Sequence, residues 1–508
     1  MLNYTPIARP FFVARAKSLT HHADDLERVQ RRTLLRLLRI ARSTEIGREF
    51  GFSSISGPRH YAERVPLMPY EQIRPQVMRM VAGERDVLWP GVTRRFAQSS
   101  GTSDGRSKFI PVTDASLHMN HYVGSSSAVA EYLKLYPDSK IFGGRSFILG
   151  GSFATALENV PAHVRVGDLS ANMIEAMPSI AGRFRIPASK DVALMADWKE
   201  KLPALVRASA KADVRSISGV PSWFLTVIRE VMKEVGADSI HDVWPNLEVF
   251  FHGGISFGPY REQYKAITDP SKMHYLETYN ASEGFFAVQD RREPGAMLLL
   301  PDVGIYYEFE PLDGGNPVPA WEVEQGRVYA LILSAPNGLW RYSTGDTVKI
   351  ETVSPLRISI AGRTKLFINA FGEELMVYNS DAALASTCSK LGCEVSDYTA
   401  APVYTTDHSR GRHQWLVEFS GREPDIERFA SELDMALCNE NSDYAAKRAG
   451  SIFLDPVEVI PLPEGTFNSW LESTGKLGGQ RKVPRLCPDR RIADAILNDT
   501  ESLRHSYT

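Results

Sequence analysis

Apolar and polar positions near the N-terminus alternate with a helical period. Between residues 26 and 42, leucine, valine and isoleucine recur every three or four positions, and six arginines lie between them. This pattern predicts an amphipathic helix with one buried face and one charged face. Acidic residues flank the run, so we expect the arginines to form a solvated face rather than a nucleic-acid surface.

Beyond about residue 65 the pattern changes to short apolar runs separated by loops rich in glycine, proline and serine. The runs at 147–150, 214–218, 247–251 and 328–333 predict strands, and the stretch at 222–235 predicts a helix. Strands that alternate with helices predict a largely parallel α/β core. The alternating residues at 305–310 predict a strand of a separate, more antiparallel β region.

The chain of 508 residues exceeds the roughly 250–300 residues that one hydrophobic core reaches. We expect a boundary near Gly362, which separates residues 1–361 from residues 362–508. The second part mixes a predicted helix at 424–439 with predicted strands at 413–419 and 457–461, and a polar helix is expected after Pro488. The predicted fold class is α/β, with mixed sheets and helices in a large N-terminal domain and a smaller α+β C-terminal domain.

The charges nearly cancel, since 58 Lys and Arg oppose 61 Asp and Glu for a formal net charge of −3. This balance argues against a general nucleic-acid partner, which needs a basic surface. The sequence has no signal-peptide core and no run of about 20 apolar residues, so we expect no membrane partner. Of the four cysteines, only Cys388 and Cys393 are close, and no zinc-site spacing accompanies them. We therefore expect reduced thiols and a cytoplasmic protein.

Three segments carry candidate chemistry. The first runs from Ser99 to Lys108 and combines two glycines, several hydroxyls and one lysine. Glycines allow backbone amides to approach an anion, and hydroxyls and an ammonium bind phosphate oxygens. The spacing differs from that of a Walker-type loop. We interpret the segment as a phosphate-binding loop whose residues are Ser99, Ser100, Gly101, Thr102, Ser103, Gly105 and Lys108.

The second segment contains Tyr279, Ala281, Ser282 and Glu283, and it follows the pair Gly253 and Gly254. An aromatic ring can stack on a base, a hydroxyl can reach a phosphate, and a carboxylate suits Mg²⁺. Taken alone this signal is weak, because Tyr279 also fits a hydrophobic core and Glu283 also fits a surface.

The third segment runs from Tyr342 to Asp346, where an aspartate follows Gly345. A carboxylate in this position can accept two hydroxyl hydrogens of a ribose. In isolation, a plain turn explains the segment equally well.

The order of the three segments resembles that of the adenylate-forming superfamily of acyl-activating enzymes. More narrowly, the chain resembles the bacterial branch of the Gretchen Hagen three family of acyl-acid amido synthetases. The resemblance also covers Val65-Pro66-Leu67 and the segments at 167–170, 216–223, 362–373 and 475–485. It implies an AMP-forming ligase that uses ATP and Mg²⁺ to activate a small carboxylic acid and join it to an amino acid.

By this resemblance, the loop from Ser99 to Lys108 holds the triphosphate. Tyr279 flanks the adenine opposite Gly253 and Gly254, Ser282 contacts the α-phosphate beside Ala281, and Glu283 binds Mg²⁺. Asp346 and Arg363 hold the ribose. The family's third motif usually reads Y-R-x-G-D, whereas this chain has Ser343 in the Arg position, and Arg341 is the candidate to replace that charge.

The resemblance also implies a hinge near 362–366, about which a mobile C-terminal domain rotates between half-reactions. Lys482 matches the lysine that this domain brings to the site for adenylation, and Lys476 is the nearby alternative. An ammonium there offsets charge at the α-phosphate. The catalytic residues are thus expected to be Lys482, Lys108 and Glu283, and we expect a monomer or a weak homodimer.

The acyl pocket is the least determined part of the site. Apolar and aromatic side chains in the expected segments suit an aryl or alkyl acid, and the candidates are Leu149, Phe153, Leu169, Met173, Val220 and Trp223. Two other functions remain open, namely an acyl-CoA ligase of the same superfamily and a non-catalytic acyl-adenylate-binding protein.

Overall fold

The structure of the chain is a computed structural model that describes most of the sequence. The described residues are 2–99, 108–153, 155, 157, 160–178, 182–254, 257–363, 367–368, 373, 375–404, 411–441, 444–445, 448, 454–474 and 483–506. None of the helices within these ranges combines the length and the apolar character needed to cross a membrane.

The chain divides into two compact units. Unit 1 comprises residues 1–255, 265–344 and 348–359, and unit 2 comprises residues 256–264, 345–347 and 360–508. The predicted hinge at 362–366 falls largely outside the described residues, so the hinge and the boundary near Gly362 stay predictions.

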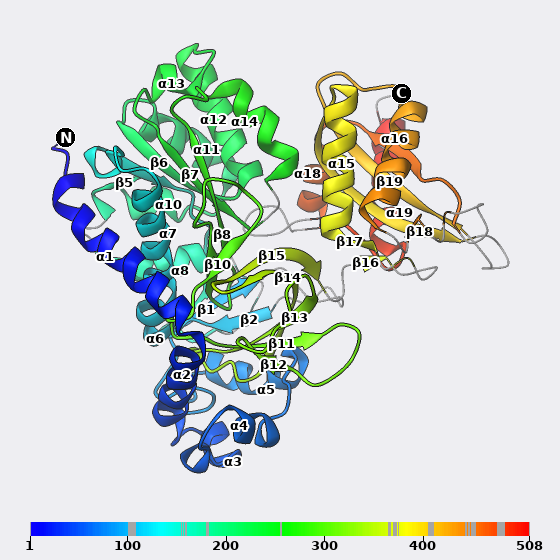
Figure 1. Cartoon of the computed structure of the whole chain (residues 1–508). Helices are drawn as coiled ribbons and strands as arrows, with labels where there is room; N and C mark the ends of the chain where they lie inside the picture. Colours follow the sequence, from blue (N-terminus) through cyan, green and yellow to red (C-terminus); the bar gives the residue numbers. More distant parts are fainter. Residues whose placement is uncertain are drawn as a thin grey trace. The chain divides into compact units, whose positions relative to one another are not determined.

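A sheet of twelve strands forms the centre of unit 1 (Figure 1). Its strand order is β12-β11-β13-β14-β15-β10-β9-β8-β7-β6-β3-β5. The strands are β3 (Arg145–Ile148), β5 (Arg185–Ile186), β6 (Val214–Gly219), β7 (Val249–Gly253), β8 (His274–Asn280), β9 (Phe285–Val288), β10 (Met297–Leu299), β11 (Tyr306–Pro311), β12 (Val318–Pro319), β13 (Val328–Ser334), β14 (Tyr342–Val353) and β15 (Leu356–Arg363).

Five of these strands, β5, β3, β6, β7 and β8, run parallel. Helices cover both of their faces. On β7, the ring of Phe250 packs against that of Phe224 in α12 (Pro221–Val235), with 5.6 Å between the ring centroids. The ring of the next residue, Phe251, packs against that of Tyr132 in α7 (Tyr122–Leu135), with 5.8 Å between the centroids. Successive side chains of a strand point to opposite faces, so the parallel core predicted from the sequence is confirmed.

The rest of the large sheet is largely antiparallel, as the pairs β8–β9, β9–β10, β10–β15, β11–β13 and β11–β12 show. The antiparallel pairing predicted for residues 305–310 is confirmed in β11. The expectation of a separate β region was wrong, because β13, β14, β15, β10 and β9 connect β11 to the parallel strands in one sheet. A turn-rich sequence marks a change of strand direction but does not end hydrogen bonding between strands.

A smaller sheet of unit 1 consists of β1 (Arg95–Ser99), β2 (Lys108–Pro111) and β4 (Arg165–Gly167) in the order β2-β1-β4. The remaining α-helices of this unit are α1 (Thr5–Asp24), α2 (Leu26–Ala41), α3 (Glu45–Glu49), α4 (Pro58–Arg64), α5 (Tyr70–Val81), α6 (Asp114–Ser116), α8 (Leu169–Ala176), α10 (Lys190–Ala193), α11 (Trp198–Ser209) and α13 (Ile240–Val243), while α14 (Arg261–Ile267) spans residues of both units.

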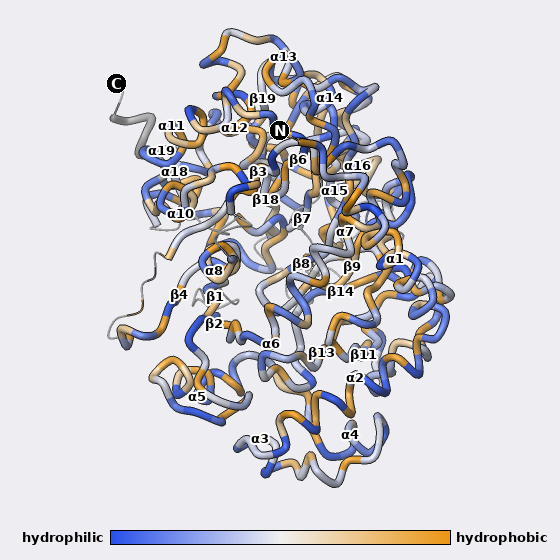
Figure 2. The backbone as a smooth tube through the Cα atoms, turned by 90° about the vertical axis from the view of Figure 1, so that its left-hand side faces the viewer, coloured by the Kyte–Doolittle hydropathy of each residue, from blue (hydrophilic) through white to orange (hydrophobic). Residues whose placement is uncertain are grey.

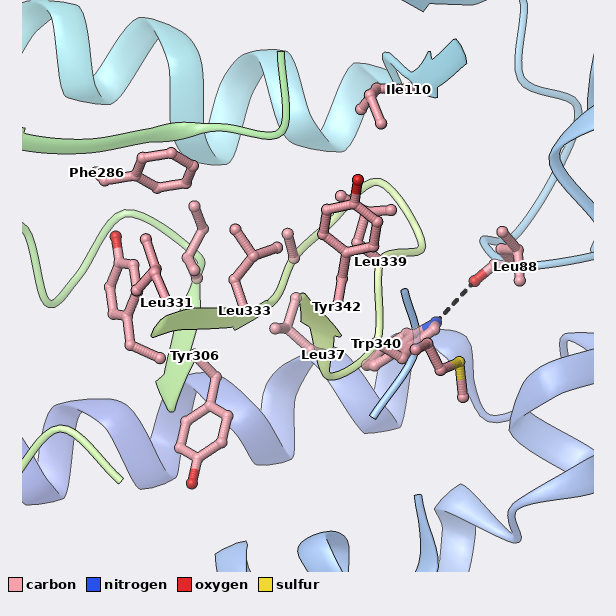
Figure 3. Packing of buried hydrophobic residues seen from close by; sticks show 14 of the residues in the cluster. Leu37, Leu88, Ile110, Phe286, Tyr306, Leu331, Leu333, Leu339, Trp340 and Tyr342 are labelled. Atoms are coloured by element: carbon pink, nitrogen blue, oxygen red, sulfur yellow. Dashed lines mark hydrogen bonds between the residues drawn. The ribbon is translucent and has the colours of Figure 1, made fainter. Parts of the chain in front are cut away.

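Helix α2 confirms the amphipathic prediction at the N-terminus. Leu34, Leu37 and Leu38 are buried, whereas the arginines of the run are exposed. Hydrophobic and hydrophilic residues alternate along this helix in Figure 2. The buried leucines belong to a large core cluster that includes Tyr306, Trp340 and Tyr342 (Figure 3).

Unit 2 contains a three-stranded sheet in the order β18-β19-β20, formed by β18 (Glu394–Tyr404), β19 (Gly411–Ser420) and β20 (Glu458–Leu462). A short pair, β16 (Phe367–Ile368) and β17 (Leu375–Met376), precedes it. Its helices are α15 (Val377–Leu391), α16 (Ile426–Glu440), α18 (Thr466–Ser473) and α19 (Arg491–Ser506). The α+β character predicted for the C-terminal domain is confirmed.

Candidate active site

The first candidate segment connects two paired strands. Ser99 ends β1 and Lys108 begins β2, and the two residues lie opposite each other in the antiparallel register. The predicted phosphate-binding residues between them, Ser100, Gly101, Thr102, Ser103 and Gly105, lie outside the described residues. The structure therefore fixes the two ends of the predicted loop.

The side chain of Lys108 lies between two tyrosines. Its Nζ donates a hydrogen bond to Tyr342 Oη at 3.3 Å and lies 5.7 Å from the ring centroids of both Tyr70 and Tyr342. The Tyr70 hydroxyl accepts a hydrogen bond from the backbone N–H of Phe109 at 2.7 Å, and burial raises the pKa of Tyr70. Aromatic faces attract an ammonium, so the two rings hold Lys108 in a defined direction.

Glu283 continues this arrangement. The Tyr342 hydroxyl donates to Glu283 Oε1 at 3.4 Å, and Asn337 Nδ2 donates to the backbone oxygen of Glu283 at 3.1 Å. Glu283 is 9% exposed, and Asn337 is fully buried. One residue from each candidate segment thus takes part in a single chain of hydrogen bonds, Lys108–Tyr342–Glu283.

The second segment forms a tight turn between β8 and β9. The backbone N–H groups of Ala281 and Gly284 each donate to the other residue's carbonyl, at 2.8 and 3.2 Å. This turn places Ser282 and Glu283 beyond the strand ends. Tyr279, in contrast, is buried and packs edge-on against Phe286, with 4.8 Å between the ring centroids. Its contact with adenine stays a prediction.

Gly253 and Gly254 lie at the carboxyl end of β7, beside β8. A Cβ atom added to Gly253 would lie 2.3 Å from the carbonyl oxygen of Thr278, and Gly254 has a φ of +81°. Glycine is therefore required at position 253 for the close approach of the strands, and the positive φ at position 254 also favours glycine. Open α/β sheets bind ligands beyond the carboxyl ends of their parallel strands, which is where this pair lies.

The predicted ribose and lysine contacts are only partly described. Asp346 lies in β14 four residues after Tyr342, follows Gly345 with a φ of +84°, and is 8% exposed. Arg363 ends β15, and its side chain is not described. Lys476 and Lys482 lie outside the described residues. The roles of Asp346, Arg363 and Lys482 stay predictions.

Arg341 does not replace the missing arginine of the third motif. Its Nε donates to both carboxylate oxygens of Glu308, at 3.1 and 3.0 Å, and its Nη1 donates to the carbonyl oxygens of Ala62 and Val65. Both members of the ion pair are buried, at 6% and 3% side-chain exposure. The guanidinium is thus committed to the protein core.

The predicted acyl-pocket residues differ in burial. Leu149 and Leu169 are buried, whereas the other four candidates, Phe153, Met173, Val220 and Trp223, are half-buried. Leu169 and Met173 lie one turn apart on α8. Half-buried apolar side chains near strand and helix ends suit the wall of a pocket, but their contact with an acid stays a prediction.

A buried lysine, Lys201, contacts the loop that follows β3. Lys201 Nζ donates to the carbonyl oxygens of Gly150 and Gly151 at 2.6 and 3.1 Å. Burial lowers the pKa of Lys201 to about 8, and the negative charge of Asp168 opposes that shift. Asp168 Oδ2 in turn accepts from the backbone N–H of Ser152 at 2.7 Å. This network connects the loop after β3 to the start of α8.

Four residues of these networks were missed by the sequence argument, namely Tyr70, Lys201, Asn337 and the hydroxyl of Tyr342. Tyr342 begins the third segment, so a search for hydroxyls within the segments finds it. The other three lie outside the segments, and each reaches its partner only through the tertiary fold. Local sequence contains no signal for such contacts.

Comparison with known proteins identifies the family. Residues 15–273 match the GH3 family N-terminal domain, residues 297–363 the GH3 family central domain, and residues 378–491 the GH3 family C-terminal domain. The N-terminal match alone spans half of the chain.

Two relatives that are named for an activity are plant enzymes. A jasmonoyl–L-amino acid synthetase, GH3.5 of Oryza sativa subsp. japonica, is 26% identical over 91% of this chain and 92% of its own length. A probable indole-3-acetic acid-amido synthetase, GH3.1 of Arabidopsis thaliana, is 22% identical over 95% of this chain and 93% of its own length.

Solved structures share the fold. The acyl acid amido synthetase AtGH3.15 in complex with 2,4-DB has a TM-score of 0.79 at 17% identity and covers 97% of this chain and 96% of its own. A 2-hydroxyisobutyryl-CoA ligase in its postadenylation state has a TM-score of 0.56 at 14% identity and covers 97% and 91%. The predicted α/β fold of two domains is confirmed. The chain belongs to the GH3 family of acyl-acid amido synthetases, AMP-forming ligases that adenylate a carboxylic acid and conjugate it to an amino acid.

Proposed function

We propose that this chain uses ATP and Mg²⁺ to convert a small carboxylic acid into an acyl adenylate and then transfers the acyl group to an amino acid. The observation that carries the proposal is the hydrogen-bonded chain Lys108–Tyr342–Glu283. A cation and a carboxylate, each from a different segment, meet at one hydroxyl. This is the pair of charges that a metal–triphosphate needs.

The residues present fit ATP and magnesium. The Glu283 carboxylate is a hard oxygen ligand, and the Lys108 ammonium is a phosphate partner held by two tyrosines. When bound, Mg²⁺ would supply charge neutralisation at the phosphates, and Glu283 would hold it. Lys108 would hold the triphosphate together with the Ser99–Lys108 loop, and Asp346 would orient the ribose.

In the first half-reaction, the substrate carboxylate attacks the α-phosphorus of ATP, and pyrophosphate leaves. Positioning and charge neutralisation account for most of such a displacement. Lys482 is proposed to approach the α-phosphate at this stage. In the second half-reaction, the amine of an amino acid attacks the acyl carbon, an amide forms and AMP leaves.

The acid is proposed to be an aryl or alkyl carboxylic acid. The half-buried side chains of Phe153, Met173 and Trp223 support an apolar pocket, and the plant relatives are named for jasmonoyl and indole-3-acetic acid conjugates.

We place the chain in the bacterial branch of the family, supported by its identity of only 22–26% to these plant relatives. The free thiols of all four cysteines support a reducing, cytoplasmic location, and we expect a monomer or a weak homodimer.

Pyrophosphate exchange into ATP, measured across a panel of carboxylic acids, tests the first half-reaction. At least one acid should support exchange, and mass spectrometry with mixed amino acids should then detect an amide. A panel in which every acid fails would contradict the proposal. Products that contain coenzyme A in place of an amino acid would select the acyl-CoA ligase alternative.

Variants of the two proposed charges sharpen this test. Lys108→Met and Glu283→Gln should each slow exchange strongly, and Lys482→Ala should slow it while AMP binding persists. Lys349→Met is the matched control, because Lys349 lies in β14 with a side chain that is 41% exposed. Equal rates for Lys108→Met and this control would remove Lys108 from the site.

A further inference from the structure

The end of helix α15 brings two cysteines together. Gly392 follows the helix with a φ of +65°, and the backbone N–H groups of Gly392 and Cys393 both approach the carbonyl oxygen of Cys388, the latter at 3.2 Å. A bond from the residue after the glycine back to the fifth residue before it closes a Schellman-type cap. A contact between the side chains of those two positions frequently accompanies this cap, and here both positions are cysteines.

The two cysteines occupy the same environment. Both side chains are half-buried and pack against the same core cluster of unit 2. The neighbouring Cys388 thiol lowers the pKa of Cys393 despite partial burial and the nearby charge of Glu394. The same interaction and burial raise the pKa of Cys388.

The other two cysteines lie in different surroundings. Burial raises the pKa of Cys487 to about 11, and this side chain is 2% exposed and contacts the hydroxyl of Thr399. Burial also raises the pKa of Cys438. Since the thiolate is the reactive form, the raised pKa values of Cys438 and Cys487 disfavour reaction at those residues. The cap, in contrast, holds the backbone of Cys393 against that of Cys388.

We propose that Cys388 and Cys393 form a reversible dithiol–disulfide site that hydroperoxides oxidise. The Cys393 thiolate attacks one oxygen of hydrogen peroxide, the O–O bond breaks, and a proton completes the departing water. Cys393 is then a sulfenic acid. The Cys388 sulfur attacks the Cys393 sulfur, the S–O bond breaks, and a second water leaves with the Cys388 proton. Two thiols lose two electrons in total, and one peroxide becomes two waters.

The backbone is already arranged for this bond. Six residues, 388–393, close the ring, and the cap hydrogen bond holds its ends. A disulfide requires Cα atoms within about 4.4–6.8 Å, and the bond from the Cys393 N–H to the Cys388 carbonyl oxygen at 3.2 Å holds the two backbones together. The bond would fix the end of α15 to the start of β18, and a cellular dithiol would reverse it by exchange.

Tryptic digestion resolves the product cleanly, because Lys390 lies between the two cysteines. The full-length protein is treated with hydrogen peroxide, blocked with N-ethylmaleimide and digested. Peptides 366–390 and 391–410 should appear joined, with a mass two hydrogens below their sum, and dithiothreitol should separate them. In Cys388→Ser, Cys393 should stop at the sulfenic acid and react with dimedone, whereas Cys438→Ser should retain the linked peptides.

Two results would overturn the proposal. One is full N-ethylmaleimide labelling of both Cys388 and Cys393 in wild-type protein after peroxide has oxidised a free-thiol reference to completion. The other is a linked product that is a dimer through Cys393 alone, whose yield rises with protein concentration. Faster alkylation of Cys438 than of Cys393 in the reduced protein would contradict the assignment of Cys393 as the nucleophile.

Discussion

Replacing Tyr342 by phenylalanine tests whether the chain Lys108–Tyr342–Glu283 serves adenylation. The substitution removes one hydroxyl and leaves the ring, which is fully buried, in the core cluster. It therefore removes the 3.3 Å bond from Lys108 Nζ and the 3.4 Å bond to Glu283 Oε1 without opening a cavity.

The expected loss follows from these distances. A hydrogen bond to a charged group contributes about 1.5–3 kcal/mol, and both bonds lie at the long end of the usual range. We therefore take about 1.5 kcal/mol for the loss of transition-state stabilisation. Each 1.36 kcal/mol changes a rate about tenfold, so kcat/KM for pyrophosphate exchange should fall by roughly tenfold.

Tyr307→Phe is the matched control. Tyr307 lies in the same core cluster and is fully buried, but its hydroxyl has no hydrogen-bond partner among the described residues. Removing it should leave exchange unchanged and leave the unfolding midpoint equal or higher. Full exchange activity in Tyr342→Phe, with the two variants equally stable, would refute the role assigned to the hydroxyl.

Three further predictions concern stability. Glu308→Gln leaves the buried charge of Arg341 without its counter-ion, so the free energy of unfolding in urea should fall by about 3–5 kcal/mol. Gly124→Ala places a Cβ atom 2.4 Å from the ring of Phe285, so the same measurement should show a loss of about 1–3 kcal/mol. Burial lowers the pKa of His121 to about 4, so the unfolded state binds the extra proton. The stabilisation from neutral His121 should be complete above about pH 6.5 and decline toward pH 4, by roughly 3 kcal/mol in total.

Each of these has its own control. Glu63→Gln removes half of an exposed ion pair with Arg59 and should change stability by under about 1 kcal/mol. In Gly182→Ala the added Cβ atom meets no atom of the described residues within 4 Å, so this variant should be nearly neutral. In His121→Leu the histidine-dependent decline between pH 6.5 and 4 should disappear. If wild-type stability depends on pH in the same way as that of His121→Leu, the argument from the buried histidine is contradicted. If Glu308→Gln loses no more stability than Glu63→Gln, the ion-pair argument is contradicted. Equal losses in Gly124→Ala and Gly182→Ala would contradict the packing argument.

The sequence predicted which segments form strands better than where the strands end. Residues 147–150 were predicted as a strand, but β3 spans Arg145–Ile148, and residues 247–251 were predicted where β7 spans Val249–Gly253. The reason is that apolar runs report burial rather than hydrogen bonding between strands. Leu149 and Leu247 are both buried, yet each lies just outside its strand.

The candidate site shows a similar division. Residue types and order pointed to Lys108, Glu283 and Asp346, because their chemistry is local to each segment. Their connection was not predictable, since it depends on two sheets: Lys108 begins a strand of the small sheet, whereas Tyr342 begins β14 of the large one. The cysteine spacing suggested no site, and only the cap at Gly392 brings Cys388 and Cys393 together.

Arg341 connects the stability of the core to the site itself. The residue has a φ of +40°, which is costly for a side chain other than glycine, so its surroundings must hold it. Glu308 and the carbonyl oxygens of Ala62 and Val65 bind its guanidinium, while its own carbonyl accepts from the N–H of Met68 at 2.9 Å.

The next residue along the chain is Tyr342, whose hydroxyl joins Lys108 to Glu283. Val65 and Glu308 therefore act on the site through the backbone at Arg341. The guanidinium of Arg341 serves the core and not the position that Ser343 occupies in the third motif. The ion pair of Arg341 fixes the backbone where β14 begins. It thereby fixes the direction of the Tyr342 hydroxyl, which joins Lys108 to Glu283.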